Sequence, residues 1–171
     1  YGFQEINLNL GCPSGTVVAK GKGSGLLAYP DQLEAFLDEI FSALDLKISV
    51  KTRIGLEEPE EFPVLLALFN RFPLEELIVH PRLRKDFYKG KPDLETFALA
   101  VRESRNPLCY NGDLFSREMV RQFTERFPAV DRLMLGRGLV ADPALLNELH
   151  GEPGLSKERF LHFHDRLVEE Y

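Results

Sequence analysis

The feature that most constrains this chain is the alternation of five short apolar segments with segments whose apolar residues recur at helical spacing. Regular alternation of this kind produces parallel strands joined by right-handed crossovers. We therefore expect an α/β fold with five βα units. The expected strands cover residues 5–8, 47–55, 76–82, 107–113 and 132–138.

Helices are expected between these strands and after the last one. Residues 15–25, which contain several glycines and two lysines, predict a loop instead. Ser116 is expected to be the N-cap of one helix, and the pair Asp142-Pro143 is expected to begin another. The expected helices lie near residues 33–44, 62–69, 94–101 and 116–127, after residue 142, and at 156–171.

Two architectures suit five βα units: an open doubly wound sheet and part of a (β/α)8 barrel. The sequence lacks a G-x-G-x-x-G motif after its first strand, which favours the barrel. A complete barrel has eight units and about 250 residues, so five units indicate its C-terminal portion. We expect a partial barrel domain over residues 1–150, followed over residues 151–171 by a linker and the start of a helical domain.

Composition argues against several classes of protein. The 171-residue chain has a net charge of −6, which disfavours unspecific binding of nucleic acid over its whole surface. It has no apolar run as long as a membrane span and no Cys, His or carboxylate spacing that suits a metal. Two cysteines are too few for a disulfide framework and indicate a cytoplasmic protein. The first residue is Tyr1, so we expect the natural chain to begin earlier.

Polar residues stand at the end of every expected strand, where parallel α/β folds build their sites. Cys12 follows the first strand in a Gly-Cys-Pro corner, which favours a thiol at a loop tip over a core cysteine. Cys109 lies in mid-strand and is expected to be buried. The other strand-end residues are Asn9, Lys51, Arg53, His80, Arg82, Asn111, Gly112, Asp113, Gly136, Arg137 and Gly138. The glycine N–H groups and Arg137 suit a phosphate group.

Three of these residues have competing interpretations. Lys51 and Arg53 are two positions apart, so their side chains share one face of a strand, and inside a barrel both cations would need anionic partners. His80 taken alone is more readily a core histidine. A basic segment follows the third strand and contains Arg82, Arg84, Lys85, Lys89 and Lys91.

Five motifs, taken in order, resemble the tRNA-dihydrouridine synthases. This resemblance implies a flavin-dependent (β/α)8 barrel that reduces uridine in tRNA. It covers about residues 5–150, and the stretches Lys20–Leu27 and Tyr88–Gly90 also look like the family. The motifs are Asn9-Leu-Gly-Cys-Pro13, Val50-Lys-Thr-Arg-Ile-Gly55, Val79-His-Pro-Arg82, Asn111-Gly-Asp113 and Gly136-Arg-Gly138.

The resemblance implies catalytic and cofactor roles. Cys12 would donate a proton to C5 of the uracil ring, and an ordinary thiol suits this task because it is mostly protonated at neutral pH yet releases its proton. Lys51 would contact the N1/O2 edge of the flavin, where a cation stabilises the anionic hydroquinone. His80 would also contact FMN. The FMN phosphate would be held by Asn111, Gly112, Asp113, Gly136 and Arg137.

The resemblance implies a substrate side as well. The partner would be tRNA, whose target uridine must be turned out of the stacked helix, and the electron donor would be NADPH. The basic segment would supply phosphate contacts. The substrate-binding residues would be Asn9, Arg53, Arg82 and Arg84.

Two departures from the family pattern stand out. The first barrel strands would precede Tyr1, and a C-terminal helical domain would be represented at most by residues 155–171. His80 is followed by Pro81, where a small residue such as Gly is more usual. Two other functions remain open: a dihydroorotate dehydrogenase-like flavin enzyme acting on free pyrimidines, and a non-catalytic RNA-binding barrel. The sequence does not predict an oligomeric state.

Overall fold

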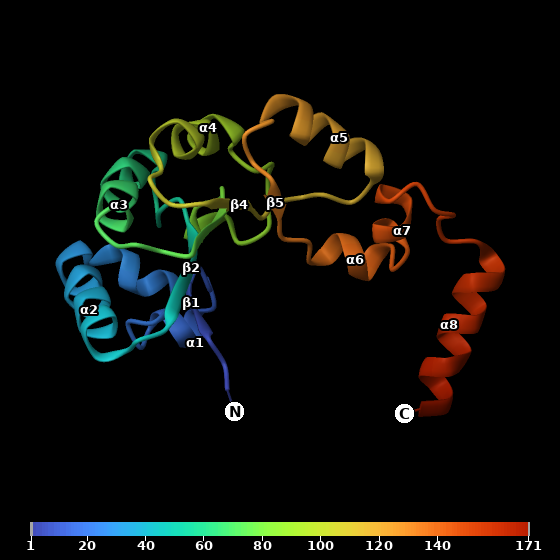
Figure 1. Cartoon of the computed structure of the whole chain (residues 1–171), viewed down its shortest axis with the longest axis horizontal. Helices are drawn as coiled ribbons and strands as arrows, with labels where there is room; N and C mark the ends of the chain where they lie inside the picture. Colours follow the sequence, from blue (N-terminus) through green and yellow to red (C-terminus); the bar gives the residue numbers. More distant parts are fainter. Residues whose placement is uncertain (1, 171) are drawn as a thin grey trace. The chain divides into compact units, whose positions relative to one another are not determined.

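The computed structural model of this chain describes residues 2–170, and its centre is a parallel five-stranded sheet (Figure 1). The strands are hydrogen-bonded in the order in which they occur along the chain. The predicted α/β fold with five βα units is therefore confirmed. The strands are β1 (Glu5–Leu10), β2 (Lys47–Arg53), β3 (Glu76–His80), β4 (Leu108–Tyr110) and β5 (Arg132–Leu133).

The chain divides into two compact units. Unit 1 comprises the residues up to 112 together with 127–134, and unit 2 comprises 113–126 and the residues from 135 onward. The expected boundary at residue 150 stays a prediction. Besides the sheet, unit 1 holds α1 (Gly15–Val18), α2 (Pro30–Ala43), α3 (Phe62–Phe69) and α4 (Leu94–Glu103), with 3₁₀ turns η1 (Gly23–Ala28), η2 (Pro59–Glu61) and η3 (Arg84–Asp86). Unit 2 holds α5 (Arg117–Arg126), α6 (Arg137–Ala141), α7 (Leu145–Leu149) and α8 (Lys157–Glu170).

The core of unit 1 lies between one face of the sheet and the helices α2, α3 and α4, which Figure 1 shows along one side of the strands. Val50 and Val79 are buried on this face. The Tyr110 ring meets the Phe97 ring of α4 edge to face, with centroids 5.0 Å apart, and Phe97 meets Phe127 in the same way at 5.3 Å. Such aromatic pairs stabilise a core beyond their buried area, so these contacts fix α4 against β4.

The opposite face of the sheet carries the polar residues. Asn9 is the register partner of Lys51, Lys51 of Ile78, and Ile78 of Cys109. Arg53 is the partner of His80 on the adjoining strand. Because side chains alternate along a strand and register partners point to the same side, these residues share the face turned away from the helices. This arrangement positions the candidate site.

Two expected elements differ from those observed. The predicted loop at residues 15–25 contains the short helix α1 and the start of η1. The last strand ends at Leu133, and Arg137–Ala141 form α6 where a strand end and turn were expected. Gly136, at φ −130° and ψ −96°, is the residue that immediately precedes α6.

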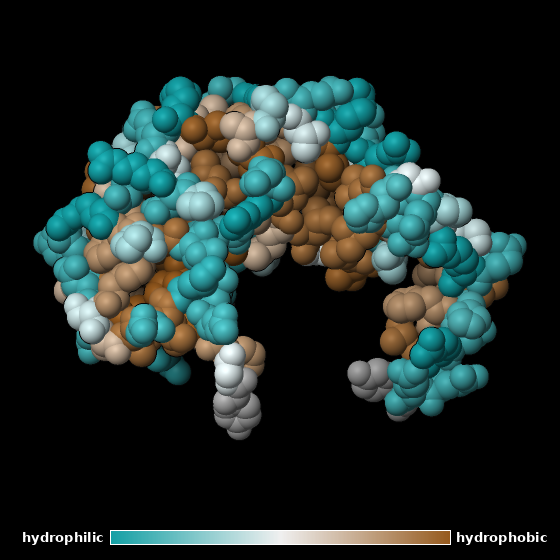
Figure 2. Space-filling view, viewed as in Figure 1, coloured by the Kyte–Doolittle hydropathy of each residue, from teal (hydrophilic) through white to brown (hydrophobic). Residues whose placement is uncertain are grey.

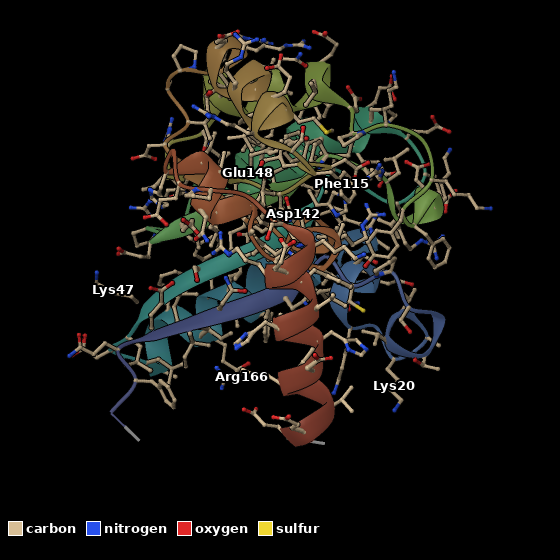
Figure 3. The ribbon with its side chains drawn as sticks, turned by 90° about the vertical axis from the view of Figure 1, so that its right-hand side faces the viewer. Lys20, Lys47, Phe115, Asp142, Glu148 and Arg166 are labelled. Carbon is tan, nitrogen blue, oxygen red and sulfur yellow. The ribbon has the colours of Figure 1, made fainter. Side chains whose placement is uncertain are left out.

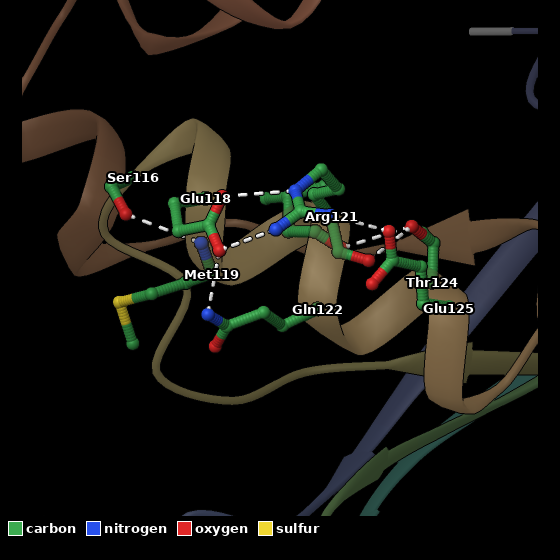
Figure 4. Close-up of polar contacts among 8 residues, drawn as sticks. Ser116, Glu118, Met119, Arg121, Gln122, Thr124 and Glu125 are labelled. Atoms are coloured by element: carbon green, nitrogen blue, oxygen red, sulfur yellow. Dashed lines mark hydrogen bonds and ion pairs between the residues drawn. The ribbon is translucent and has the colours of Figure 1, made fainter.

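Two expected helix starts can be compared directly. The Oγ of Ser116 accepts a hydrogen bond from the N–H of Met119 at 3.2 Å, which confirms Ser116 as the N-cap of α5 (Figure 4). After Asp142-Pro143, α7 begins only at Leu145. The Asp142 side chain instead forms a turn by accepting from the N–H of Ala144 at 2.9 Å.

Helix α8 of unit 2 has no buried residue. Figure 2 shows its hydrophobic residues exposed among hydrophilic ones. A groove of about 540 Å³ lies between α7 and α8, and none of the predicted site residues lines it. Within residues 2–170, no helix is both long enough and apolar enough to cross a membrane.

Candidate functional site

The turn that follows β1 presents Cys12. The Asn9 side chain begins this turn by accepting from the N–H of Gly11 at 3.1 Å. The Cys12 carbonyl then accepts two hydrogen bonds from Ser24, one from its N–H at 3.0 Å and one from its Oγ at 2.8 Å. Gly23 has φ +55°, and a Cβ added there would lie 2.9 Å from the Cys12 carbonyl oxygen. The glycine-rich segment therefore packs against Cys12, whose thiol is partly exposed.

This turn lies at the carboxyl end of the sheet. Figure 3 shows Lys47 at the start of β2 and Lys20, in the glycine-rich segment, beyond the opposite end of the strands. The Cys12 turn and the residues that end β2 and β3 therefore gather at one edge, as sites in parallel α/β folds do.

Lys51 is half-buried on the polar face of the sheet. Burial lowers the pKa of its ammonium group, and the nearby Arg53 lowers that pKa further. The thiols of Cys109 and Cys12 lie close enough to act on Lys51 electrostatically. Among the residues that the structure describes, none accepts a hydrogen bond from its Nζ. A desolvated cation without an acceptor is suited to a ligand that carries anionic or carbonyl oxygen atoms.

Arg53 was expected to need an anionic partner. Its guanidinium group instead donates hydrogen bonds to backbone carbonyls. Its side chain is 1% exposed. Nε donates to the carbonyl of Gly11 at 3.0 Å, Nη1 to that of Leu83 at 2.8 Å and Nη2 to that of Phe87 at 2.7 Å. Arg53 thus joins the Cys12 turn to the loop that follows β3. A direct contact between Arg53 and substrate stays a prediction.

Arg82 holds the same loop from its other end. It is also 1% exposed, and it donates to the carbonyls of Lys89 at 3.1 Å and Gly90 at 2.7 Å. Its Nη1 lies 3.1 Å from Nε2 of His80. Because a guanidinium group only donates, Nε2 of His80 is the acceptor in a hydrogen bond between these two side chains. His80 is buried at the carboxyl end of β3, as a cofactor ligand or a core histidine would be.

Part of the charge of the basic segment is paired. The Arg84 guanidinium forms an ion pair with Glu57, and Lys85 lies 3.3 Å from Glu58. Phe87, Tyr88, Lys89 and Lys91 are exposed. The exposed part of the basic segment therefore combines aromatic residues with two lysines. Its positive charge is smaller than the sequence suggests, because Arg84 and Lys85 are paired with carboxylates.

Asn111 and Gly112 follow β4 in unit 1. The Asn111 amide donates from Nδ2 to the carbonyl of Met134 at 2.8 Å, which ties the end of β4 to the segment after β5. Gly112 lies against the Tyr110 side chain, whose hydroxyl a Cβ would overlap. Both residues thus have structural contacts, and their binding of a phosphate stays a prediction.

Asp113, Gly136 and Arg137 belong to unit 2. Nη2 of Arg137 lies 2.5 Å from a carboxylate oxygen of Asp113, and its guanidinium carbon lies 5.6 Å from the centre of the Phe115 ring. Arg137 therefore already binds one oxyanion, the carboxylate. A phosphate is a second anion of the kind that a guanidinium group recognises.

Cys109 is buried, as its position in mid-strand predicted, and burial raises the pKa of its thiol to about 12. Cys12 is therefore the more accessible of the two thiols. Within residues 2–170 no cluster of three or more metal-ligating side chains occurs.

Sequence reasoning missed three participants in the site: Ser24, Phe87 and the carbonyl of Gly11. Backbone acceptors and a serine in a glycine-rich loop carry no recognisable motif. The one available signal was the placement of two arginines at adjacent strand ends, each at a position where a charge is costly unless it is paired.

A parallel sheet with a thiol, an amine and an imidazole at the carboxyl ends of its strands is typical of an α/β-barrel enzyme. The family model of dihydrouridine synthase (Dus) matches residues 1–164, so the chain belongs to the dihydrouridine synthase family. Its five βα units form part of a (β/α)8 barrel.

Curated relatives agree with this family. The chain is 33% identical over 151 residues to tRNA-dihydrouridine synthase B of Vibrio parahaemolyticus, covering 87% of this chain and 46% of the relative. It is 34% identical over 148 residues to the probable tRNA-dihydrouridine synthase of Staphylococcus aureus, covering 83% of this chain and 44% of the relative. The chain spans about half the length of these relatives.

Proposed function

We propose that the protein carrying this chain reduces uridine in tRNA to dihydrouridine. The observation that carries this proposal is that the partly exposed Cys12 and the half-buried Lys51 lie at the same carboxyl edge of the sheet, close enough for an electrostatic interaction. An acid beside a cation suits a reaction in which a ring receives a hydride and then a proton. The names of the relatives supply the substrate.

The residues present fit FMN as the hydride source. Lys51 has an ammonium group that lacks an acceptor among the described residues, and an isoalloxazine ring offers acceptors at N1 and O2. His80 would bind the same cofactor. The phosphate would be bound by Asn111, Gly112, Asp113, Gly136 and Arg137. When bound, FMN supplies the hydride that reaches C6 of uracil.

Cys12 supplies the proton that completes the reduction of the uracil ring. As the hydride arrives at C6, the C5–C6 double bond opens and negative charge develops at C5 and O4 of the ring. The Cys12 S–H bond breaks and its proton forms the new C5–H bond. The thiolate that remains is stabilised by Lys51 and regains a proton from solvent.

The remaining roles follow from the same proposal. Asn9, Arg53, Arg82 and Arg84 form the substrate side, with Arg53 and Arg82 acting through the loop that they hold. NADPH would be the electron donor for the bound cofactor, and the protein would work in the cytoplasm.

The experiment that tests this proposal is mass spectrometry of tRNA from cells that lack the gene. Loss of one dihydrouridine, restored by the parent gene and not by Cys12→Ala, supports it. Unchanged dihydrouridine, together with turnover of free dihydropyrimidines by the purified flavoprotein, would instead identify an enzyme of free pyrimidines. Purified protein that contains no flavin and binds tRNA would indicate the non-catalytic RNA-binding barrel.

A further inference from the structure

Residues 83–90, which follow β3, form a loop that two buried arginines hold at several points; we call it the braced loop. Arg53 binds the carbonyls of Leu83 and Phe87, and Arg82 binds those of Lys89 and Gly90. Arg53 also binds the carbonyl of Gly11, beside Cys12. Buried charge-assisted hydrogen bonds are strong, so the loop is fixed relative to the Cys12 turn.

At the tip of the braced loop, Phe87 adopts an unfavourable backbone conformation. It has φ +51° and ψ −96°, and it is the single non-glycine residue with positive φ in the described part of the chain. The Arg53 contact at 2.7 Å binds the carbonyl of this same residue. Strain of this kind persists only where surrounding contacts impose it, and it is concentrated at functional and ligand-binding positions.

The strained backbone leaves the Phe87 ring in solvent. The ring is 48% exposed, while the neighbouring Tyr88 lies over Arg53, with 5.7 Å between the guanidinium carbon and the ring centre. Lys89 and Lys91 are exposed next to it, and among the described residues neither has a carboxylate partner. An exposed aromatic residue whose backbone is held by Arg53, next to two lysines, matches a ligand that has both a flat apolar face and negative charge.

We propose that Phe87 is a stacking platform for an unpaired base of the RNA substrate, and that Arg53 and Arg82 are positioning residues that hold it beside the Cys12 turn. This inference rests on the proposed function, because it names the part of the RNA that the site would contact. Aromatic side chains stack on bases of any sequence, and neighbouring lysines bind the phosphates on either side. The proposal also gives the strained backbone of Phe87 a role, because the residue is exposed in that conformation.

The first test measures binding of this chain to a short single-stranded oligouridine and to an unmodified tRNA transcript. Phe87→Ala should weaken both affinities by about 5- to 150-fold, the range for losing one stacked base. Tyr29→Ala is the matched control because its ring is 54% exposed and lies at the start of α2, away from the braced loop in sequence. It should leave both affinities unchanged.

Salt dependence separates stacking from charge. Phe87→Ala should keep the slope of log affinity against log salt concentration, because no ion is released from a stacked ring. Lys89→Ala should reduce that slope by about one. A smaller slope in Phe87→Ala would contradict stacking and indicate that the substitution had displaced the lysines.

A spectroscopic test uses the absence of tryptophan from the chain. Phe87→Trp introduces a single tryptophan at the tip of the loop. When this tryptophan is excited selectively, stacking on a base should quench its emission on addition of oligouridine while affinity is kept. Unchanged emission at saturating oligouridine would overturn the proposal, even if Phe87→Ala proved unstable.

The positioning role of Arg53 is tested by amide hydrogen exchange together with RNA affinity. Arg53→Lys keeps the charge and cannot reach three carbonyls, so amide hydrogen exchange should become faster at residues 83–90 and RNA affinity should fall as in Phe87→Ala. Normal affinity with fast exchange would contradict the positioning role. If the intact protein that carries this chain binds neither RNA, the proposed function fails together with this inference. If it binds both RNAs and Phe87→Ala has no effect, only this inference fails.

Discussion

Asn9 of β1 and Lys51 of β2 are register partners, so their side chains leave the sheet on the same face at its carboxyl edge. The Asn9 side chain begins the turn that carries Cys12, and burial lowers the pKa of the Lys51 ammonium group. The pairing of β1 with β2 therefore brings the proposed acid, Cys12, and the proposed cofactor contact, Lys51, to the same edge of the sheet.

Replacing Lys51 by methionine tests its cofactor role. Lys51→Met keeps the length of the side chain and removes the donor, so FMN affinity should fall by about 10- to 100-fold, the value of a charge-assisted hydrogen bond. Equilibrium dialysis of FMN against the variant and the parent measures this. Equal affinities would show that Lys51 does not contact the cofactor.

Lys51→Met should weaken FMN binding but should not lower the free energy of unfolding of the cofactor-free protein. Because burial lowers the pKa of Lys51 below its ordinary 10.5, the native state releases this proton before the unfolded state does. The contribution of Lys51 to the free energy of unfolding therefore rises with pH between its lowered pKa and 10.5. At neutral pH, the buried charge of Lys51 destabilises the native state. Without cofactor, Lys51→Met should be at least as stable as the parent at pH 7, and its advantage should shrink as pH rises. Urea unfolding at several pH values checks this; a less stable variant at neutral pH would contradict it.

Arg53 should be important for stability as well as for the loop. Arg53→Met leaves three carbonyls without their donor, at a cost of about 2–4 kcal/mol. Arg121→Met is the control, because Arg121 forms exposed ion pairs with Glu118 and Glu125 on α5 (Figure 4) and its loss should leave the unfolding midpoint nearly unchanged. Similar midpoints for the two variants would refute this account of the braced loop.

Two neighbouring glycines give a matched pair in unit 2. A Cβ on Gly138 would overlap the carbonyl oxygen of Leu114, whereas a Cβ on Gly136 would meet open space. Gly138→Ala should destabilise unit 2 by about 1–3 kcal/mol, and Gly136→Ala should change its stability little. Thermal unfolding followed by circular dichroism compares them, and an equal loss in both variants would be inconsistent with the close approach of Gly138 to Leu114.

Most of the fold could be predicted because its signals are local. Alternation and β-branched residues marked β2 and β3, and the capping serine marked α5. The end of β5 could not be predicted, because Leu133 and Met134 are as apolar as the residues of a longer strand. After Leu133, Met134 still donates to the carbonyl of Tyr110 at 2.8 Å, and the chain then turns into α6 at Arg137, a change that no local sequence signal marks.

The sequence predicted which residues belong to the candidate site better than it predicted what those residues contact. The motifs indicated Cys12, Lys51 and His80, and the structure brings all three to the carboxyl edge of one sheet. The partners of Arg53 could not be predicted, because carbonyls of three distant residues become acceptors only once β1, β2 and β3 are paired. A charged residue at a strand end thus predicts a structural or functional role, but the sequence does not show whether its side chain contacts a ligand or the protein itself.

The most direct test of the central claim compares Cys12→Ala with Cys109→Ala in the protein encoded by this gene. We predict that Cys12→Ala lowers the rate of uridine reduction in tRNA by about 10²- to 10⁴-fold, the contribution of a general acid, while its flavin is still reduced by NADPH at the parent rate. Cys109→Ala, which removes a buried thiol, should retain uridine reduction. A Cys12→Ala variant that reduces uridine at the parent rate would contradict the account.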